Sequence, residues 1–337
     1  MPNICMVGTG YVGLVSGACL ADFGNTVICV DIDSERIKNI KNDIMPIYEP
    51  GLKELVRRNY DAGRLKFTTD LAAAVKESLV IFSAVGTPMG DDGSADLSAV
   101  YSVSKDIALN MDGYRVFVQK STVPVGTSDE VGRIIRENLK GDIPFDLVSN
   151  PEFLREGSAI EDFMRPNRVV IGVKSDQARK IMKDIYRPLY LLETPLVFTS
   201  IRTAELVKYA SNAFLAVKIS FINEISDLCE KLDADVSEVA RGIGLDKRIG
   251  PKFLHAGAGY GGSCLPKDVS AILHTADKSD VPLRVIRAAS DVNEERIDII
   301  LKKLGNEIDD LKGKKIAILG LSSVSYTHLT LPTTPYV

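Results

Sequence analysis

The 337-residue sequence has few cysteines and histidines and no large excess of charge of either sign, and each shortage excludes a class of function. Its 41 basic and 45 acidic residues are mixed along the chain, so we expect no basic face that would bind nucleic acid or anionic lipid. No apolar run is long enough to span a bilayer, and the first residues have no signal-peptide pattern. These absences predict a cytoplasmic protein that acts on a small molecule and has neither a nucleic-acid nor a membrane partner.

The five cysteines have irregular spacing, which gives neither a disulfide framework nor the pattern of a metal site. Four of them lie within apolar runs and are predicted to be buried packing residues: Cys5, Cys19, Cys29 and Cys229. Cys264 differs because it lies in the glycine-rich segment GAGYGGSCLPKD of residues 257–268. Catalysis by histidine is not expected, since one of the three histidines has the helical spacing of a packed residue and another lies near the end of the chain.

The first residues have the pattern of a dinucleotide-binding unit, and the length of the chain favours at least one further domain. A predicted strand at residues 3–7 leads into GTGYVG, followed by a predicted helix at residues 14–23 and a strand at residues 26–30. Gly8 allows a tight turn, Gly10 lets the backbone approach a pyrophosphate, and Gly13 allows close packing of the helix on the strand. The N–H groups at the start of the helix would bind the phosphates.

Asp31 ends the second predicted strand and is expected to accept a hydrogen bond from the adenosine ribose. Its carboxylate would repel a 2′-phosphate, so the sequence favours NAD over NADP as the cofactor. Arg36 leaves two roles open, because its guanidinium could pair with a phosphate or stack on adenine. A glycine turn that binds no nucleotide is the structural alternative.

The predicted sheet continues as a parallel sheet, and the loops after its strands carry polar residues. Further strands are predicted at residues 79–85, 116–120, 147–149 and 169–173, with helices between most of them. Ligands of open α/β sheets bind at the carboxyl ends of the strands, which makes Thr122, Glu152 and Glu156 site candidates. Ordinary turn chemistry and solvated charges are the alternative for these loops.

A long helix is predicted at residues 204–232, which have apolar residues at intervals of three and four and contain no proline or glycine. Lys208 and Asn212 project from one side of this helix, where an ammonium and an amide could stabilise a substrate alkoxide. Glu205 lies three residues before Lys208, so a solvent-exposed Glu–Lys pair is the alternative.

After the long helix the sequence predicts further helices and then the beginning of a second strand–turn unit. The helices are predicted at residues 236–241, 268–277 and 282–303, and the strand at residues 313–321. Residues 322–337 have no charged side chain and neither helical nor strand period, so they are predicted to be a non-native tail. The expected domains are residues 1–200, 201–303 and 304–321, followed by that tail.

A thiol at Cys264 beside a dinucleotide-binding unit points to oxidation through a covalent adduct. A thiolate can add to an aldehyde, and the resulting thiohemiacetal still carries a hydrogen that can leave as a hydride. The sequence therefore predicts the oxidation of an alcohol to an acid. Lys267 is expected to lower the pKa of the Cys264 thiol and so to favour its attack.

These motifs, in this order, resemble the UDP-glucose 6-dehydrogenase family of nucleotide-sugar dehydrogenases over about residues 1–321. The matching segments are GTGYVG at residues 8–13, STVPVGT at 121–127, NPEFL at 150–154, the helix with Lys208 and Asn212, and GGSCLPKD at 261–268. The resemblance implies two Rossmann-like domains joined by a helical dimerisation region. NAD would bind the first domain and UDP largely the second, which we expect to be essentially missing from this sequence. The implied protein is a homodimer that oxidises the C6 alcohol of UDP-glucose to UDP-glucuronate with two NAD.

The resemblance also implies a role for each candidate residue, with Arg248 reaching across the dimer to the substrate. The implied catalytic residues are Cys264 as nucleophile, Lys208 and Asn212 at the alkoxide, and Asp268, Glu152 and Thr122 at water. The implied cofactor contacts are Gly8, Gly10, Tyr11, Val12, Gly13, Asp31, Arg36, Thr87, Thr122 and Glu156. The implied substrate contacts are Glu152, Phe153, Leu154, Lys208, Asn212, Arg248, Phe253, Gly257, Tyr260, Gly261 and Lys267.

Alternatives to UDP-glucose oxidation remain open. GDP-mannose and UDP-N-acetylmannosamine dehydrogenases share the same chemistry, and the sequence does not identify the sugar. The β-hydroxyacid dehydrogenases share a Rossmann domain and a Lys–Asn pair on a long helix but need no thiol. The chain could also be an inactive NAD-binding fragment, because Ser323 and Val324 stand where the family has a Phe–Lys pair on the substrate.

Overall fold

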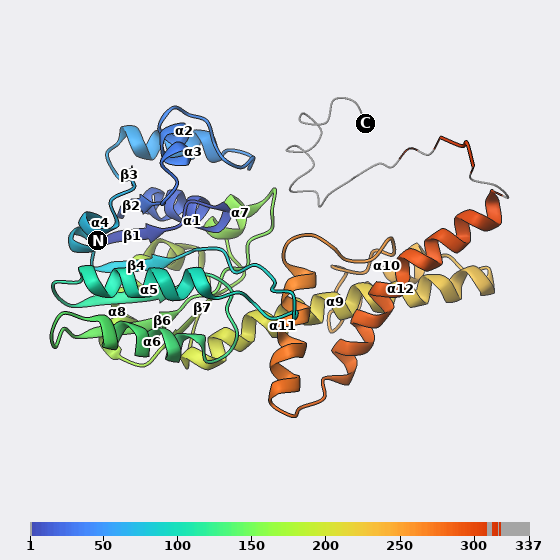
Figure 1. Ribbon diagram of the computed structural model, residues 1–337. Helices are drawn as coiled ribbons and strands as arrows, with labels where there is room; N and C mark the ends of the chain where they lie inside the picture. The colour runs from blue at the N-terminus through green and yellow to red at the C-terminus, as the bar shows by residue number, and fades with distance from the viewer. Residues whose placement is uncertain (1, 309–311, 316, 318–337) are drawn as a thin grey trace. The chain divides into compact units, whose positions relative to one another are not determined.

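The computed structural model describes residues 2–308, 312–315 and 317, and Figure 1 traces their helices and strands. The chain divides into two compact units. The first unit contains residues 2–88 and 95–208, and the second contains residues 89–94 together with the described residues from 209 onward. The expected strand at residues 313–321 lies mostly outside the described residues, and the expected tail at residues 322–337 lies wholly outside them.

An eight-stranded sheet forms the centre of the first unit. Its strands, in spatial order, are β3 (Leu65–Thr68), β2 (Thr26–Val30), β1 (Asn3–Val7), β4 (Val80–Ser83), β5 (Arg115–Gln119), β6 (Phe145–Ser149), β7 (Val169–Val173) and β8 (Leu196–Thr199). The chain starts at β1, moves outward through β2 and β3, and then returns to β4 on the other side of β1. This order defines a doubly wound α/β domain with its switch point between β1 and β4, so the predicted Rossmann-like class is confirmed.

The predicted parallel arrangement is wrong at one pair of strands. β7 runs antiparallel to β6, with Val148 opposite Val173 and Ser149 opposite Gly172, whereas β8 is parallel to β7. The connection between β6 and β7 explains the reversal, because its short helix α7 (Ala159–Met164) does not carry the chain back across the sheet. The sequence pattern does not reveal β3 and β8, which are four-residue edge strands too short for a clear period.

Both faces of the sheet are buried, which explains the nearly continuous apolar sequences of its central strands. Ile4 and Met6 of β1 belong to one hydrophobic cluster, whereas Cys5 and Val7 belong to another. Since side chains alternate across a strand, the two clusters lie on opposite faces of the sheet. The helices of this unit are α1 (Tyr11–Asp22), α2 (Ser34–Lys41), α3 (Leu52–Asp61), α4 (Leu71–Glu77), α5 (Ser98–Asn110), α6 (Thr127–Asn138), α7, α8 (Asp176–Ile185) and the 3-10 helix η1 (Arg187–Leu192).

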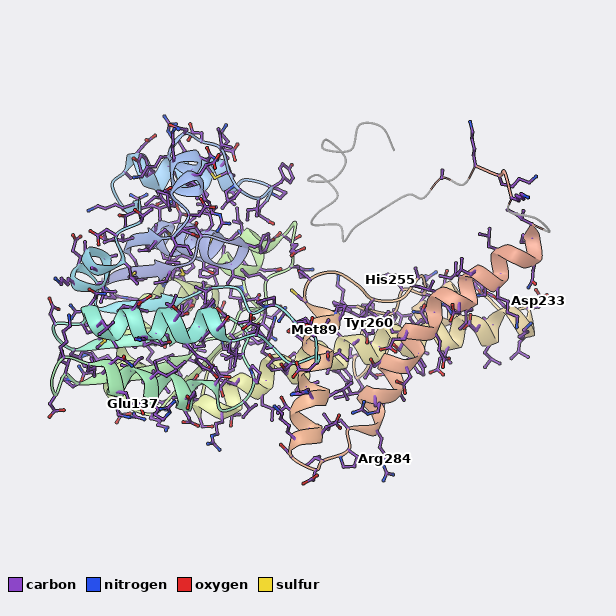
Figure 2. All side chains as sticks on the ribbon, viewed as in Figure 1. Met89, Glu137, Asp233, His255, Tyr260 and Arg284 are labelled. Atoms are coloured by element: carbon purple, nitrogen blue, oxygen red, sulfur yellow. The ribbon has the colours of Figure 1, made fainter. Side chains whose placement is uncertain are left out.

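The second unit is helical, and the helix α9 (Ile201–Leu232) belongs to both units, with its residues up to Lys208 in the first. The other helices are α10 (Val236–Gly244), α11 (Leu265–Lys278) and α12 (Arg284–Glu307). Small and apolar side chains of α9 and α11 share two clusters: Tyr209, Ala213, Ala271 and Ile272 in one, and Ala216, Val269 and Leu273 in the other. Asp233 directly follows α9 and has a φ of +55°, and α12 begins at Arg284. Figure 2 labels both residues. In the described part of the chain, no helix combines the length and the apolar character that crossing a membrane requires.

Gly172 lies where β7 meets the beginning of α9, and alanine at this position should destabilise the first unit. A Cβ there would lie 2.7 Å from both the Ala204 Cβ and the Ile201 Cα. We expect Gly172→Ala to lower the free energy of unfolding by about 1–3 kcal/mol, measured by urea denaturation. The control is Gly242→Ala in α10, where no atom lies within 4 Å of the added Cβ and stability should not fall. Equal stability of the two variants would contradict the close contact.

Candidate active site

The glycine turn after β1 has the geometry of a dinucleotide-binding site. Gly8 has a φ of +95°, and a Cβ there would lie 2.8 Å from Ala84 O, so only glycine fits. A Cβ at Gly13 would lie 1.8 Å from Gly8 O. At Gly10, the N-cap of α1, no atom lies within 4 Å of the corresponding position and no side chain caps the helix. The turn therefore leaves room for a phosphate at the start of α1, which begins at Tyr11, earlier than predicted.

Asp31 follows β2, and its carboxylate is held by several donors. Oδ2 accepts hydrogen bonds from Thr9 N and Thr9 Oγ1 at 2.8 Å and from Arg36 Nη1 at 3.0 Å, while Oδ1 accepts one from Asp33 N. Burial raises the pKa of Asp31, but these hydrogen bonds and the Arg36 charge together hold it below its usual value. The carboxylate is thus ionised and fixed beside the glycine turn, where it can accept a hydrogen bond from a ribose.

The loops after β4 and β5 contact each other at the same edge of the sheet. Thr87 Oγ1 donates a hydrogen bond to Thr122 O at 2.9 Å, and Ser121 Oγ donates one to Val85 O at 2.6 Å. Thr87 and Thr122 are both buried. The structure therefore brings together these two predicted cofactor contacts, which lie 35 residues apart in the chain.

Glu49 has no role predicted from the sequence, yet it connects the glycine turn to the loop after β6. Its buried carboxylate accepts hydrogen bonds from Tyr11 OH at 2.5 Å, Gly157 N at 2.8 Å and Ala159 N at 2.7 Å. Burial and the neighbouring Glu49 raise the pKa of Tyr11, so its hydroxyl stays protonated and donates. Glu156, a predicted cofactor contact, is partly buried in the same loop. The sequence signal was a single acid in IYEPGL, which is typical of an ordinary turn.

Glu152 and Lys208, both predicted catalytic residues, form a buried ion pair in the first unit. Lys208 Nζ lies 3.2 Å from Glu152 Oε1, and Leu154 N donates a hydrogen bond to Glu152 Oε2 at 2.6 Å. The centre of the Phe153 ring lies 5.3 Å from the same ammonium. Burial raises the pKa of Glu152, but Lys208, the Leu154 N–H and Lys120 together hold it below its usual value. The loop after β6 therefore presents an ionised carboxylate in a buried position.

The alternative of an exposed Glu205–Lys208 pair is wrong, because both side chains are buried and have other partners. Glu205 Oε2 accepts a hydrogen bond from Gly126 N at 2.8 Å, and Oε1 accepts one from Ser128 N at 2.9 Å. Glu205 thus satisfies N–H groups at the beginning of α6. Spacing within one helix could not reveal these contacts, since the two partners lie 79 and 77 residues away in the chain.

In the second unit, Asp268 is the centre of a hydrogen-bonded cluster of predicted residues. Asn212 Nδ2 donates to Asp268 Oδ2 at 2.6 Å, and Lys267 Nζ donates to Asp268 Oδ1 at the same distance of 2.6 Å. Asp268 and Asn212 are buried, whereas Lys267 is partly exposed. Asp268 therefore balances the Lys267 charge, and the expected effect of Lys267 on the thiol stays a prediction.

Cys264 is exposed at the N-cap of α11, whereas the four cysteines predicted to be packing residues are buried. Asp268 N donates a hydrogen bond to Cys264 O at 2.9 Å, so the thiol and the acid share the first turn of the helix. The N-terminus of a helix favours a thiolate over a thiol. The position of the sulfur is therefore suited to a nucleophile that must meet a ligand.

Side chains of α9 and α12 fix the glycine-rich segment that precedes the thiol. Gly257 N donates to Asn223 Oδ1 at 2.8 Å, and Arg296 Nε donates to Gly257 O at 2.8 Å. Asn293 accepts a hydrogen bond from Tyr260 N at 2.7 Å and donates one to Tyr260 O at 3.1 Å. The segment is rich in glycine, but its backbone is fixed at Gly257 and at Tyr260 by hydrogen bonds with buried or partly buried side chains.

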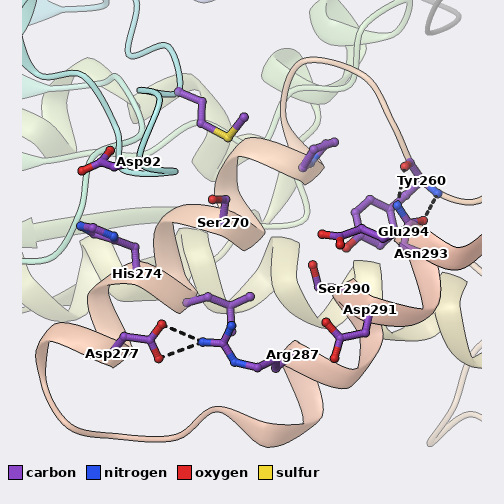
Figure 3. A pocket seen from close by; sticks show the side chains of 13 residues that line it. Asp92, Tyr260, Ser270, His274, Asp277, Arg287, Ser290, Asp291, Asn293 and Glu294 are labelled. Atoms are coloured by element: carbon purple, nitrogen blue, oxygen red, sulfur yellow. Dashed lines mark hydrogen bonds and ion pairs between the residues drawn. The ribbon is translucent and has the colours of Figure 1, made fainter.

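A polar cavity of about 520 Å³ lies beside Tyr260 in the second unit. Figure 3 shows the side chains that line it. Acidic side chains outnumber basic ones in its lining, and Arg287 is already paired with Asp277 at 2.7 Å. Of the predicted substrate contacts, Tyr260 is the one that lines this cavity. The predicted substrate contacts other than Tyr260 therefore do not line this cavity.

The remaining predicted contacts differ in their exposure to solvent. Val12, Phe153, Leu154 and Phe253 are partly buried, whereas Gly261 and Arg248 are exposed. Phe253 has a φ of +64°, which is uncommon for a residue other than glycine. Arg248 forms an ion pair with Asp246 at 2.6 Å.

The first unit combines a doubly wound α/β sheet, an open glycine turn, an acid after β2 and a buried lysine on the long helix that follows. Together these features are typical of a dinucleotide-dependent dehydrogenase. Residues 2–190 match the NAD binding domain of the UDP-glucose/GDP-mannose dehydrogenase family, and residues 202–295 match the central domain of that family. The chain belongs to the UDP-glucose/GDP-mannose dehydrogenase family and is an oxidoreductase. The predicted family is therefore confirmed.

Proteins similar to this chain include two bacterial enzymes and one archaeal structure. The UDP-glucose 6-dehydrogenase of Rhizobium meliloti (strain 1021) is 58% identical over 325 residues, which cover 95% of this chain and 74% of that protein. The UDP-glucose 6-dehydrogenase TuaD of Bacillus subtilis (strain 168) is 50% identical over 322 residues, which cover 96% of this chain and 69% of that protein. The structure of a UDP-glucose dehydrogenase from Pyrobaculum islandicum has a TM-score of 0.89 at 38% identity and covers 92% of this chain and 72% of the other.

The Glu152–Lys208 pair predicts a pH-dependent contribution to stability. The folded-state pKa of Glu152 lies below the ordinary value of 4.5, so its carboxylate stabilises the fold above that pH and loses this effect as the pH falls through the folded-state pKa. We expect Glu152→Gln to lower the free energy of unfolding by about 3 kcal/mol at pH 7, measured by urea denaturation. The difference from wild type should shrink below about pH 4.5. Glu54→Gln, at an exposed position, is the control, and an equal loss in both variants would refute the prediction.

Proposed function

We propose that the chain is a UDP-glucose 6-dehydrogenase, which oxidises the C6 alcohol of UDP-glucose to the acid of UDP-glucuronate through an adduct on Cys264. The observation that carries the proposal is an exposed thiol at the start of α11 in a chain that is 58% identical to an enzyme of that name. All five cysteines are described, and the other four are buried. A buried thiol could not reach a sugar carbon, whereas the exposed Cys264 sulfur is accessible to a ligand.

The proposed cofactor is NAD, bound at the glycine turn of the first unit. The open space at Gly10 fits a pyrophosphate, and the ionised Asp31 carboxylate fits a ribose hydroxyl. Tyr11, Val12, Arg36, Thr87, Thr122 and Glu156 complete the proposed set of contacts. When bound there, NAD supplies a hydride acceptor for each of the two oxidations.

The first oxidation needs a proton acceptor and a cation near the C6 oxygen. In the proposed mechanism, Lys208 and Asn212 stabilise the negative charge on that oxygen, and Asp268 with Thr122 orders a water that takes the hydroxyl proton. Lys208 and Asn212 lie four residues apart on α9, so their side chains leave the same side of the helix. The Asn212–Asp268 hydrogen bond of 2.6 Å supports a shared role for these two residues.

The second oxidation uses the thiol. The Cys264 sulfur adds to the aldehyde carbon, and the thiol proton passes to the aldehyde oxygen, which gives a thiohemiacetal. The carbon of this adduct then loses a hydride and its hydroxyl loses a proton to the ordered water, which leaves a thioester. A water activated by Glu152 or Asp268 attacks the thioester, the carbon–sulfur bond breaks, and the thiol is regenerated. In total, one water is consumed and two hydrides leave the carbon for each acid formed.

We also propose that the helical region forms a homodimer. α9 exposes Phe214, Phe221 and Leu228, which are spaced by seven residues and so lie along one side of the helix. Each of these side chains is at least 46% exposed, and such a stripe is typical of a helix that packs on a partner. Arg248, also exposed, is the proposed contact across the dimer. A cytoplasmic location stays a prediction from the sequence.

Cys264→Ala should separate the two oxidations. Wild type should yield two NADH and one acid per UDP-glucose, whereas the variant should make no acid and at most one NADH, because no thiohemiacetal can form. The measurement is NADH absorbance together with chromatography of the sugar nucleotide. Cys229→Ala, at a buried position, is the matched control and should keep the ratio of two.

Acid produced by Cys264→Ala would refute the covalent mechanism. A ratio of one NADH per substrate in wild type would instead favour a single-step dehydrogenase that needs no thiol. Running the same assay with GDP-mannose and UDP-N-acetylmannosamine identifies the sugar, since the proposal requires UDP-glucose to be the preferred substrate.

Asp31→Asn should weaken NAD binding and reduce the discrimination against NADP. The variant loses a charged hydrogen-bond acceptor for the ribose and the charge that repels a 2′-phosphate, so we expect the NAD dissociation constant to rise about tenfold or more. Isothermal titration with NAD and NADP measures both effects. Asp33→Asn is the control, because Asp33 caps α2 through Arg36 N and should affect stability rather than cofactor choice. Unchanged affinity for both cofactors in Asp31→Asn would contradict the proposed site.

A further inference from the structure

Lys120 is a second buried lysine of the first unit, and the mechanism above does not use it. It follows β5 directly and is 4% exposed. Its ammonium donates a hydrogen bond to Asn150 Oδ1 at 3.2 Å and lies 5.7 Å from the centre of the Phe163 ring. The hydrogen-bond partner is a neutral amide, so the desolvation of this charge costs free energy that the bond does not fully offset. Packing alone does not explain why a charged residue occupies this buried position.

Asn150 holds the Lys120 ammonium at the base of the loop that carries Glu152. Asn150 Oδ1 also accepts a hydrogen bond from Tyr186 OH at 2.6 Å, and Asn150 Nδ2 donates one to Val170 O at 2.8 Å. Asn150 is fully buried and precedes Glu152 by two residues. The position of the ammonium is therefore fixed relative to this loop.

Lys120 and Glu152 line the same small cavity, which has a volume of about 40 Å³ and so has room for water. Two further charged residues line it. Asp162 is already paired with Arg155 at 2.6 Å, and the Arg168 guanidinium lies 3.6 Å from the centre of an aromatic ring. Glu152 is therefore the carboxylate at this cavity whose charge Lys120 can balance.

The two groups act on each other through their charges. Burial lowers the pKa of Lys120 to about 8, with Glu152 opposing this shift and Lys208 adding to it. In turn, the Lys120 charge is one of the causes that hold the pKa of Glu152 below its usual value. Glu152 thus has two cationic neighbours, of which Lys208 makes the direct contact at 3.2 Å.

We propose that Lys120 is a positioning residue that keeps Glu152 ionised while Lys208 is engaged with the substrate oxygen. The inference rests on the proposed function, in which Lys208 stabilises an alkoxide and Glu152 activates water. One ammonium cannot fully neutralise two anions, and a buried carboxylate that loses its counter-ion takes up a proton. Lys120 supplies a second positive charge from the buried side of the loop and touches neither the substrate nor the reacting atoms.

Lys120→Met removes the charge and keeps an unbranched side chain of similar length. We expect the apparent pKa of Glu152 to rise by about one unit in this variant. The measurement is a pH titration of the carboxyl carbon by NMR of protein labelled with 13C-glutamate, with the resonance assigned by its loss in Glu152→Gln. This readout needs neither substrate nor turnover. The acidic limb of the pH profile for acid formation should move upward by the same amount, while the rate at higher pH should stay the same.

Two variants distinguish charge from packing. Lys120→Arg keeps the charge and should restore the wild-type titration of Glu152. Tyr186→Phe removes the other donor to Asn150 Oδ1 without changing the charge, and it should leave the titration unchanged. A loss of rate at every pH with no shift of the acidic limb in Lys120→Met would mean a structural role only and would overturn the proposal.

A wild-type titration keeps the test decisive if Lys120→Met does not fold. The Lys120 side-chain carbon next to the amine should titrate near pH 8, and the Glu152 carboxyl resonance should shift at the same pH. A Glu152 resonance that does not respond there would overturn the inference, whether or not the protein makes acid. A wild-type protein that makes no acid from any nucleotide sugar would instead refute the proposed function, while the two titrations would still decide whether Lys120 controls the charge of Glu152.

Discussion

The buried ion pair between Glu152 and Lys208 is the interaction on which the organisation of the first unit depends. Two charges are withdrawn from water here, and each is tolerated because the other is in place. The loop after β6 and the beginning of α9 must therefore keep a fixed relation to each other. Two other carboxylates of the unit, those of Glu49 and Glu205, also join segments that are far apart in the chain.

The reversed strand β7 places the long helix. β7 and β8 extend the sheet beyond β6, and α9 begins at Ile201, directly after this added edge. Gly172 of β7 has no side chain, which lets the backbone of α9 approach the strand closely. The direction of β7 is thus part of how the chain brings a lysine from the helix to a carboxylate on a neighbouring loop.

Local patterns in the sequence predicted the features that are local in the fold. The glycine turn, Asp31 after β2 and the long helix are set by residues close together in the chain, so spacing and period reveal them. The antiparallel β7 and the partners of Glu49 and Glu205 depend on segments distant in sequence, and no pattern within one segment specifies them. The Asn212–Asp268 contact joins residues 56 apart. Helical spacing made Asn212 a candidate, whereas Asp268 followed only from the family resemblance.

The close approach at Gly172 also limits how this chain can change length. A residue inserted or deleted in α9 between Ala204 and Lys208 would rotate everything that follows by about 100° about the helix axis. Such a change would turn the lysine ammonium away from the loop after β6, and the strand contact leaves the helix no freedom to slide back. Variation in length is therefore confined to segments outside this stretch, such as the exposed turn around Gly141 between α6 and β6.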